Sequence, residues 1–173
     1  MASGESHSEN LLILGAGGYG RLVKEIAEQD GRDFQKICFL DDKAVSGDVI
    51  GKLEELEKFK EEYRYAIVAM GNPGTRRRWV ERLLKIGYEL PSLVHPKAYV
   101  APSAKISDGC VVEPMAVVHA NAEVGCASFI CAGAVVNHNA KVGAFCQIDC
   151  NAVVKAGSAV QDGTKVSAGT VFC

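Results

Sequence analysis

The stretch VEPMAVVHANAEVGCASFICAGAVVNHNAKVGAFCQ, residues 112–147, divides into six hexapeptides that each begin with valine or isoleucine. The pattern extends in both directions, so that thirteen consecutive hexapeptides between Val94 and Val171 share it. The fifth residue of every hexapeptide is alanine, cysteine, serine or threonine, and is therefore small. This repeat decides the fold of the second half of the chain.

A period of six with two fixed inward positions is typical of a parallel β-helix. Three short strands close one triangular coil of eighteen residues, with the aliphatic side chain inside and the small residue at the corner. Because neighbouring strands lie about 4.8 Å apart, residues eighteen apart should stack in one interior column. The repeat resembles that of the hexapeptide acyltransferases, which implies a left-handed β-helix over residues 92–173. One interior column should be Val94, Val112, Ile130, Ile148 and Val166.

The first 93 residues have a different composition and a different pattern. They hold 30 of the 40 charged residues, and short apolar runs alternate in them with stretches of helical period. Apolar strands separated by helices predict a parallel sheet covered on both faces, here a small Rossmann-like α/β domain over residues 11–91. Residues 1–10 are expected to form a flexible leader, and residues 87–96 the joint. Strands are expected at 11–15, 36–40 and 65–70, and helices at 21–29, 53–62 and 74–86.

The last of these helices carries both an apolar and a strongly basic group of residues. Its spacing predicts that Val80, Leu83 and Leu84 form the buried face. The preceding run Arg76-Arg77-Arg78 is expected to lie on the solvated face.

The overall composition excludes several classes of protein. The chain has 173 residues, 48% of them hydrophobic, and a formal net charge of −2. Such a chain is not disordered, and its balanced charge argues against nucleic acid or an anionic membrane as partner. No apolar run approaches the ~20 residues that a membrane-spanning helix needs, and the polar beginning predicts no secretory signal.

Seven cysteines without such a signal predict reduced thiols in a cytoplasmic protein. The spacings of Cys126 from Cys131 and of Cys146 from Cys150 do not match a zinc site, so we expect no metal.

Three polar or glycine-rich segments end the three expected strands. Residues 15–20, GAGGYG, follow the first strand and open a helix, as a turn that holds a phosphate does. Asp41 and Asp42 end the next strand, and Gly71 and Asn72 end the third. The carboxyl edge of an open parallel sheet is where ligands bind, so these residues are candidates for one site. A tight turn without a ligand and a dinucleotide fingerprint are the alternatives, although about 90 residues are too few for a full dinucleotide fold.

Histidine is scarce in the chain, and two histidines lie close together in the repeat. His138 is the third residue of its hexapeptide and should project outward, next to Ala120 and Ala156 of the neighbouring coils. His119 should stack over Asn137. Two histidines near each other on a rigid coil suggest a catalytic base, although a surface histidine is more often without a role.

The segments LGAGGYG, FLDD, AMGNPGTRRR, HPKAYVAPSAKI and GAVVNHNAKVG occur in the order found in one family. The chain resembles the sugar acetyltransferases of the NeuD/PglD type, and the resemblance spans residues 11–166. It implies acetyl-CoA as co-substrate, a homotrimer with coenzyme bound between subunits, and a sugar acceptor. The acceptor would be a UDP-linked amino sugar or a sialic acid.

The resemblance also implies the role of particular residues. It places the general base on His138, with Asn139 beside it. The residues that would bind substrate are Gly17, Gly18, Tyr19, Asp41, Asp42, Gly71 and Asn72. The residues that would contact acetyl-CoA are Gln147, Ala156 and Ala168.

Two positions differ from the family pattern. Asn139 stands where the family usually has an acidic residue, and Gln147 stands where some members have a histidine. Members also typically continue for about thirty residues beyond the position of Cys173. An alternative function is therefore a catalytically weak nucleotide-sugar-binding or scaffold protein on the same fold. A third hypothesis is an NAD-linked enzyme, which the glycine turn supports and no other motif does.

Overall fold

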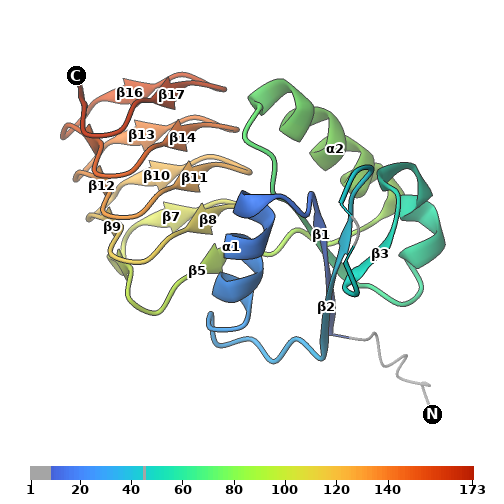
Figure 1. Ribbon diagram of the computed structural model, residues 1–173. Helices are drawn as coiled ribbons and strands as arrows, with labels where there is room; N and C mark the ends of the chain where they lie inside the picture. Colours follow the sequence, from blue (N-terminus) through green and yellow to red (C-terminus); the bar gives the residue numbers. More distant parts are fainter. Residues whose placement is uncertain (1–8, 45) are drawn as a thin grey trace, which may run out of the picture.

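The computed structural model describes residues 9–44 and 46–173, and in it an α/β domain packs beside a three-sided coil (Figure 1). Most of the flexible leader expected at residues 1–10 lies outside the described residues, and Asn10 already belongs to the first strand. The elements of the α/β domain are β1 (Asn10–Leu14), α1 (Gly18–Ala27), β2 (Lys36–Leu40), β3 (Val49–Gly51), the 3-10 helix η1 (Leu53–Phe59), β4 (Tyr65–Val68) and α2 (Pro73–Ile86).

The α/β domain is built on a parallel sheet with the strand order β3-β2-β1-β4. Side chains alternate between the two faces of a strand, and β1 shows this. Leu12 and Leu14 pack in the core with α2 and η1, whereas Leu11 and Ile13 pack with α1 on the other face. The predicted parallel sheet with both faces covered is therefore confirmed.

Several details of this domain differ from expectation. The helix expected at 21–29 begins at Gly18, and the helix expected at 53–62 is the 3-10 helix η1. The sequence did not reveal β3, a half-buried strand of three residues that pairs with β2 at the edge of the sheet. The prediction for the buried face of α2 was wrong at Leu84, which is 56% exposed. The buried residues of α2 are instead Arg76, Trp79, Val80 and Leu83, so the buried stripe begins one turn earlier than expected.

The second half of the chain is a left-handed parallel β-helix, as predicted. Three sheets form its sides. The domain-facing sheet packs against the α/β domain, the apolar sheet carries mainly valine outside, and the charged sheet carries lysine and glutamate. The domain-facing sheet contains β5 (Leu93–Val94), β8 (Val111–Val112), β11 (Phe129–Ile130), β14 (Gln147–Ile148) and β17 (Lys165–Val166). The apolar sheet contains β6 (Tyr99–Val100), β9 (Val117–Val118), β12 (Val135–Val136), β15 (Val153–Val154) and β18 (Val171–Phe172). The charged sheet contains β7 (Lys105–Ile106), β10 (Glu123–Val124), β13 (Lys141–Val142) and β16 (Ala159–Val160).

The interior of the coil follows the hexapeptide repeat. Val94 pairs with Val112, which pairs with Ile130, and the column continues through Ile148 to Val166. The fifth positions of the repeat are small because they lie inside the corners, where for instance Ala134 is completely buried. The predicted interior column is confirmed.

The fourth position of the repeat has a backbone conformation that the spacing of apolar and small residues does not predict. From Gly109 to Gly169, every fourth position has a positive φ, between 51° and 73°. Most of these residues are glycine or asparagine, the types that adopt this left-handed region most readily. The residues of other types there are Met115, Ala127 and Phe145.

In the described part of the chain, no helix has the length and apolar character needed to span a bilayer. All seven cysteines are free thiols.

Candidate active site

The glycine turn between β1 and α1 contains two kinds of glycine. Gly15 has a φ of 101°, and a Cβ added at Gly20 would lie 1.9 Å from the carbonyl oxygen of Gly15, so the fold requires glycine at both positions. A Cβ added at Gly17 or Gly18 would meet no atom within 4 Å. These two glycines are exposed at the first turn of α1, where unpaired N–H groups and the helix dipole favour an anion.

Asp41 and Asp42 lie on the same edge but have different roles. Asp41 accepts hydrogen bonds from the backbone N–H groups of Ala16, Lys43 and Ala44, and so it holds the loops together. Partial burial would raise the pKa of Asp41, but these three hydrogen bonds lower it below its ordinary value. Asp42 is exposed.

A hollow of about 370 Å³ lies beside these two carboxylates. Its wall is formed by the segments that follow β2 and that surround β3. The lining residues are Asp41, Asp42, Lys43, Ala44, Val49, Ile50, Gly51, Lys52 and Glu55. The hollow therefore adjoins the edge of the sheet that also carries the glycine turn.

The end of β4 brings the third expected segment to this edge. Gly71 is exposed, and a Cβ added there would meet no atom within 4 Å. Asn72 caps α2 by accepting a hydrogen bond from the N–H of Thr75 at 2.9 Å. Both α1 and α2 thus begin at the carboxyl edge of the sheet.

Tyr19 lies in the glycine turn but points away from the open edge. Its ring packs on Phe129 of β11 with the ring centroids 4.7 Å apart. Its hydroxyl is buried and has no hydrogen-bond partner among the described residues. Burial, and next the nearby carboxylate of Glu113, hold the pKa of Tyr19 well above its ordinary value. Tyr19 therefore joins α1 to the coil.

His138 lies in the corner between β12 and β13, on the outside of the coil. The Nδ1 atom of His138 is 3.1 Å from Nδ2 of Asn139. In the adjacent coil, Nδ1 of His119 is 3.1 Å from Oδ1 of Asn137, as the predicted stacking requires. Asn137 Oδ1 also accepts a hydrogen bond from the backbone N–H of His138. The two histidines thus share one corner and one asparagine.

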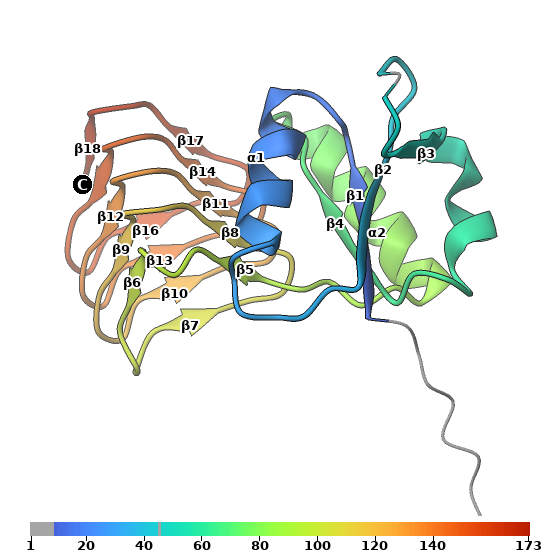
Figure 2. The same cartoon turned by 60° about the horizontal axis from the view of Figure 1, so that its bottom comes forward.

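The corner of His138 lies opposite the domain-facing sheet, because it joins the other two sheets of the coil. Figures 1 and 2 both show β12, the strand that leads into this corner, on the far side of the coil from the α/β domain. Within one chain, His138 and the carboxyl edge of the α/β sheet are therefore not brought together.

The three residues expected to contact acetyl-CoA lie on three different parts of the coil. Gln147 is on the domain-facing sheet, with its Nε2 atom 4.0 Å from Sγ of Cys131. Ala156 is exposed in the corner of His138, one coil further along the chain. Ala168 is exposed in the corner between the domain-facing and apolar sheets. One chain therefore brings Ala156 close to His138 but leaves Gln147 and Ala168 apart from them.

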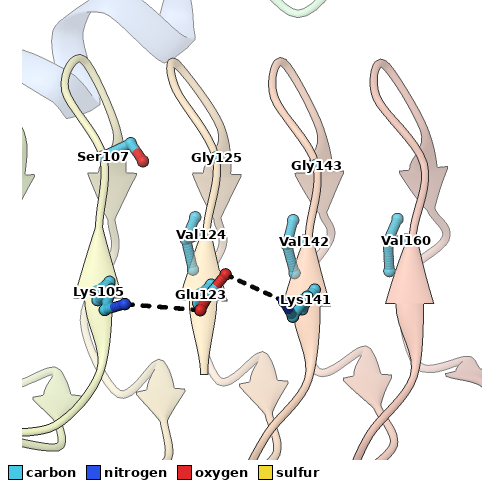
Figure 3. Close-up of a pocket in the computed structure, with 9 residues that line it drawn as sticks. All are labelled: Lys105, Ser107, Glu123, Val124, Gly125, Lys141, Val142, Gly143 and Val160. Carbon is cyan, nitrogen blue, oxygen red and sulfur yellow. Dashed lines mark ion pairs between the residues drawn. The ribbon is translucent and has the colours of Figure 1, made fainter. Parts of the chain in front are cut away.

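A further hollow of about 320 Å³ lies on the charged sheet. Figure 3 shows Lys105, Glu123 and Lys141 side by side on three neighbouring strands. Glu123 pairs with Lys105 at 3.7 Å and with Lys141 at 3.5 Å, which leaves one net positive charge among these three side chains. None of the residues expected to bind substrate or coenzyme lines this hollow.

The prediction for Arg76 was wrong as well as that for Leu84. Arg76 was expected on a solvated helix face, yet its side chain is completely buried between α2 and the coil. Its spacing from Trp79, Val80 and Leu83 indicates the buried face, but arginine in a run of three suggested solvent. Arg77 and Arg78 are exposed, as expected.

Among residues 9–44 and 46–173, no group of three or more histidine, cysteine, aspartate or glutamate side chains is arranged to hold a metal ion.

Comparisons with known proteins agree with this fold. Residues 10–83 match the family model of the PglD N-terminal domain. The acetyltransferase domain of PglB from Neisseria gonorrhoeae FA1090 is 32% identical, with a TM-score of 0.85 over 95% of this chain and 91% of that one. The same domain has also been solved in complex with acetyl coenzyme A.

Two more relatives are less similar. UDP-N-acetylbacillosamine N-acetyltransferase from Bacillus subtilis is 29% identical over 113 residues, which are 60% of this chain and 51% of the relative. The match thus spans about half the length of that protein. Perosamine N-acetyltransferase from Caulobacter crescentus, in complex with CoA and GDP-perosamine, is 23% identical with a TM-score of 0.83 over 95% of this chain and 88% of that one, and so shares the fold.

Proposed function

Because this chain belongs to the same family as the acetyltransferase domain of PglB, we propose that it is an acetyl-CoA-dependent N-acetyltransferase. Its acceptor would be the amine of a nucleotide-linked sugar. The observation that carries this proposal is the 32% identity over nearly the whole of both chains to a domain that binds acetyl coenzyme A. The amine, rather than a hydroxyl or a sialic acid, is chosen because the Bacillus subtilis relative is an N-acetyltransferase of a UDP-linked sugar.

We propose that the sugar nucleotide binds at the carboxyl edge of the α/β sheet. Gly17, Gly18 and Gly71 leave open space there, so a diphosphate could approach the N–H groups at the start of α1. The hollow beside Asp42 would take the nucleoside, with the side chain of Asp42 as a hydrogen-bond acceptor. Asp41 and Asn72 would shape this site without touching the ligand, since both side chains bond the backbone.

His138 would act as the general base. An unprotonated ring nitrogen can take the proton of the sugar amine as the amine attacks the thioester carbonyl, which contributes about 10²–10⁴ in rate. The exposed position of His138 leaves its ring accessible, and the backbone N–H of Ala156 beside it would stabilise the developing oxyanion. The proton would then pass to the leaving thiolate of the coenzyme.

A homotrimer would complete the site. Within one chain, His138 lies in the corner that joins the two sheets of the coil not packed against the α/β domain, away from the proposed sugar site, so another copy would supply one of them. The apolar sheet offers a surface for assembly, because its outward residues form an apolar column in which Tyr99 and Val171 are 55% and 60% exposed. Coenzyme would bind at the contact between copies, where Gln147 and Ala168 of one copy could approach Ala156 of the next. We further propose a cytoplasmic location, which suits the free thiols of the exposed Cys150 and Cys173.

A catalytically weak sugar-nucleotide-binding protein is the second candidate, and Asn139 favours it. An asparagine next to the histidine cannot supply the negative charge that would stabilise an imidazolium. Binding of sugar nucleotide without turnover would identify this function.

The experiment that tests the proposal is a mass-spectrometric screen of UDP- and GDP-linked amino sugars with acetyl-CoA. We expect one acceptor to gain about 42 mass units, the difference between an acetyl group and the hydrogen that it replaces. His138→Ala should abolish this gain. His119→Ala serves as the matched control in the same corner. Unchanged turnover of His138→Ala would refute the role of this histidine, and absence of any acetylated product would refute the activity.

A further inference from the structure

Arg76 is a buried arginine whose hydrogen-bonding capacity is fully used. Its side chain has no exposed surface, and its five N–H groups each donate to a backbone carbonyl oxygen. A guanidinium bonded in this way cannot move without leaving buried carbonyl groups unpaired, which is costly. Arg76 therefore fixes the relative position of every segment that it touches.

The carbonyl groups bonded by Arg76 come from both domains. In the α/β domain, Nη1 donates to the carbonyl oxygens of Met70 at 2.7 Å and of Gly71 at 3.1 Å. These residues follow β4 at the edge of the proposed sugar-nucleotide site.

In the coil, the remaining donors of Arg76 reach two successive turns of the β-helix. Nε donates to the carbonyl oxygen of Ala127 at 2.8 Å, and Nη2 donates to those of Phe145 at 2.5 Å and Cys146 at 3.2 Å. One side chain thus ties the end of β4 to two turns of the coil.

The coil itself is adapted to this contact at a cost in backbone strain. Ala127 and Phe145 have φ values of 51° and 59°, in the left-handed region that disfavours residues with a Cβ. The equivalent positions of the turns before and after are glycines, Gly109 and Gly163. Both side chains pack into the core formed with α2, so these two strained residues lie where the coil meets the α/β domain, whereas Met115, the third of this kind, is exposed.

Phe129 connects the same contact to the glycine turn. The guanidinium of Arg76 lies 4.1 Å from the centroid of the Phe129 ring, and the ring of Tyr19 lies 4.7 Å from that centroid. Arg76 belongs to the first turn of α2 and Tyr19 to the first turn of α1. Both helix ends that border the proposed sugar-nucleotide site are therefore attached to one phenylalanine of the coil.

We propose that Arg76 is a positioning residue, which holds the sugar-nucleotide edge of the α/β domain at a fixed distance and angle from the coil. This inference rests on the proposed function, because the fixed geometry matters where substrate bound on one domain must reach a histidine carried by a coil. A displacement of about 1 Å between reacting groups can cost about 100-fold in rate. Arg76 makes no hydrogen bond to Gly17 or Gly18 at the start of α1, so the proposed diphosphate contacts there do not need Arg76.

The test compares Arg76→Met with Arg78→Met, which removes an exposed arginine from the same helix. We expect Arg76→Met to lower kcat between about 10-fold and 100-fold, with the Kd for the sugar nucleotide within about twofold of the parent value. Arg78→Met should leave both quantities unchanged. A role in stability by itself would lower the unfolding temperature of Arg76→Met while kcat of the folded protein stays at the parent value, and that result would overturn the proposal.

Hydrogen exchange gives a second readout that needs no turnover. Arg76→Met should speed exchange in peptides covering residues 69–76 and 144–147 by about tenfold or more, without affecting residues 135–142 at the far corner. Unchanged exchange at the first two segments would overturn the proposal. If the parent protein acetylates no acceptor but exchange changes as expected, the proposed activity fails and the positioning contact stands.

A second variant covers the case in which Arg76→Met does not fold. Phe145→Gly removes an aromatic ring from the contact between the domains. It also gives position 145 the residue type found at the equivalent position of the next turn, Gly163, so it relieves the backbone strain at the φ of 59°. We expect a loss of kcat of about 10-fold with an unchanged Kd. Parent values of kcat and of hydrogen exchange in this variant would overturn the proposal.

Discussion

Asn139 controls which nitrogen of His138 carries the proton, so replacing it should change the turnover number in a defined direction. Nδ2 of Asn139 lies 3.1 Å from Nδ1 of His138. An amide nitrogen can only donate, so in this pairing Nδ1 accepts and the proton of the neutral ring lies on Nε2. With Nε2 already protonated, the ring cannot use Nε2 to take a proton from the amine of the sugar.

The size of the effect follows from one hydrogen bond. Such a bond contributes about 1 kcal/mol net, which biases the two tautomers by a factor of about five. Asn139→Gly removes the donor, and glycine suits the φ of 56° at this position. We therefore expect Asn139→Gly to raise kcat about fivefold. Asn139→Asp should raise kcat about tenfold or more, because a carboxylate accepts from Nδ1–H and stabilises the imidazolium that forms.

The assay follows release of the coenzyme thiol at saturating acetyl-CoA and sugar nucleotide. Asn121→Gly is the matched control, since Asn121 occupies the same position one coil earlier with a φ of 57° and should not affect kcat when replaced. A fall in kcat for Asn139→Gly would refute the reasoning, because it would mean that Asn139 orients His138 through its oxygen. Equal kcat values for the parent protein, Asn139→Gly, Asn139→Asp and Asn121→Gly would show that the contact between Asn139 and His138 has no influence on the base.

Three further predictions concern folding, pH and the glycine turn. Ile148→Ala, in the middle of the interior column, should lower the free energy of unfolding by about 4 kcal/mol. Ile106→Ala, in the partly buried first coil, should lower it by about half as much. Urea unfolding at one protein concentration measures both values, and equal losses would contradict the column packing. Hydrogen bonds from Arg21, Ser46 and Lys24 hold the pKa of Asp48 far below its ordinary value, so Asp48 stabilises the fold above the unfolded pKa of about 4 and loses this contribution as the pH falls. Asp48→Asn should therefore cost about 1 kcal/mol at pH 7 and less below pH 4, as thermal unfolding across pH would show, and a gap that widens in acid would contradict this sign. Gly20→Ala should prevent folding, because the added Cβ would lie 1.9 Å from the carbonyl oxygen of Gly15. Gly17→Ala should fold normally, because its Cβ meets no atom within 4 Å, and should weaken sugar-nucleotide binding measured by calorimetry. Binding of parent affinity in Gly17→Ala would exclude Gly17 from the site.

Much of the fold could be predicted because its signals are local. The hexapeptide repeat indicated the coil and its interior columns, and the apolar runs indicated β1, β2 and β4. The short strand β3 was missed because Val49–Gly51 is half-buried and pairs with one neighbour at the edge of the sheet. No periodicity distinguishes three such residues from a loop.

The interpretation of Arg76 failed for a different reason. A charged side chain is buried when partners for its donors exist, and the coil partners of Arg76 lie 51 to 70 residues further along the chain. The same holds for Tyr19, whose ring packs on Phe129 of the coil rather than facing the open edge. Neither contact leaves a trace in the spacing of nearby residues.

The sequence by itself determined the two architectures, the position of His138 on an outer corner and the glycine-rich edge of the α/β sheet. These follow from periodicity and from the backbone needs of glycine, which act over a few residues. Only the tertiary structure decided how the domains join through Arg76 and Phe129, which glycines the fold itself requires, and that His138 lies on the side of the coil away from the α/β domain. Those properties depend on which distant groups satisfy a buried donor or fill a buried face, and such partners are chosen when the chain packs in three dimensions.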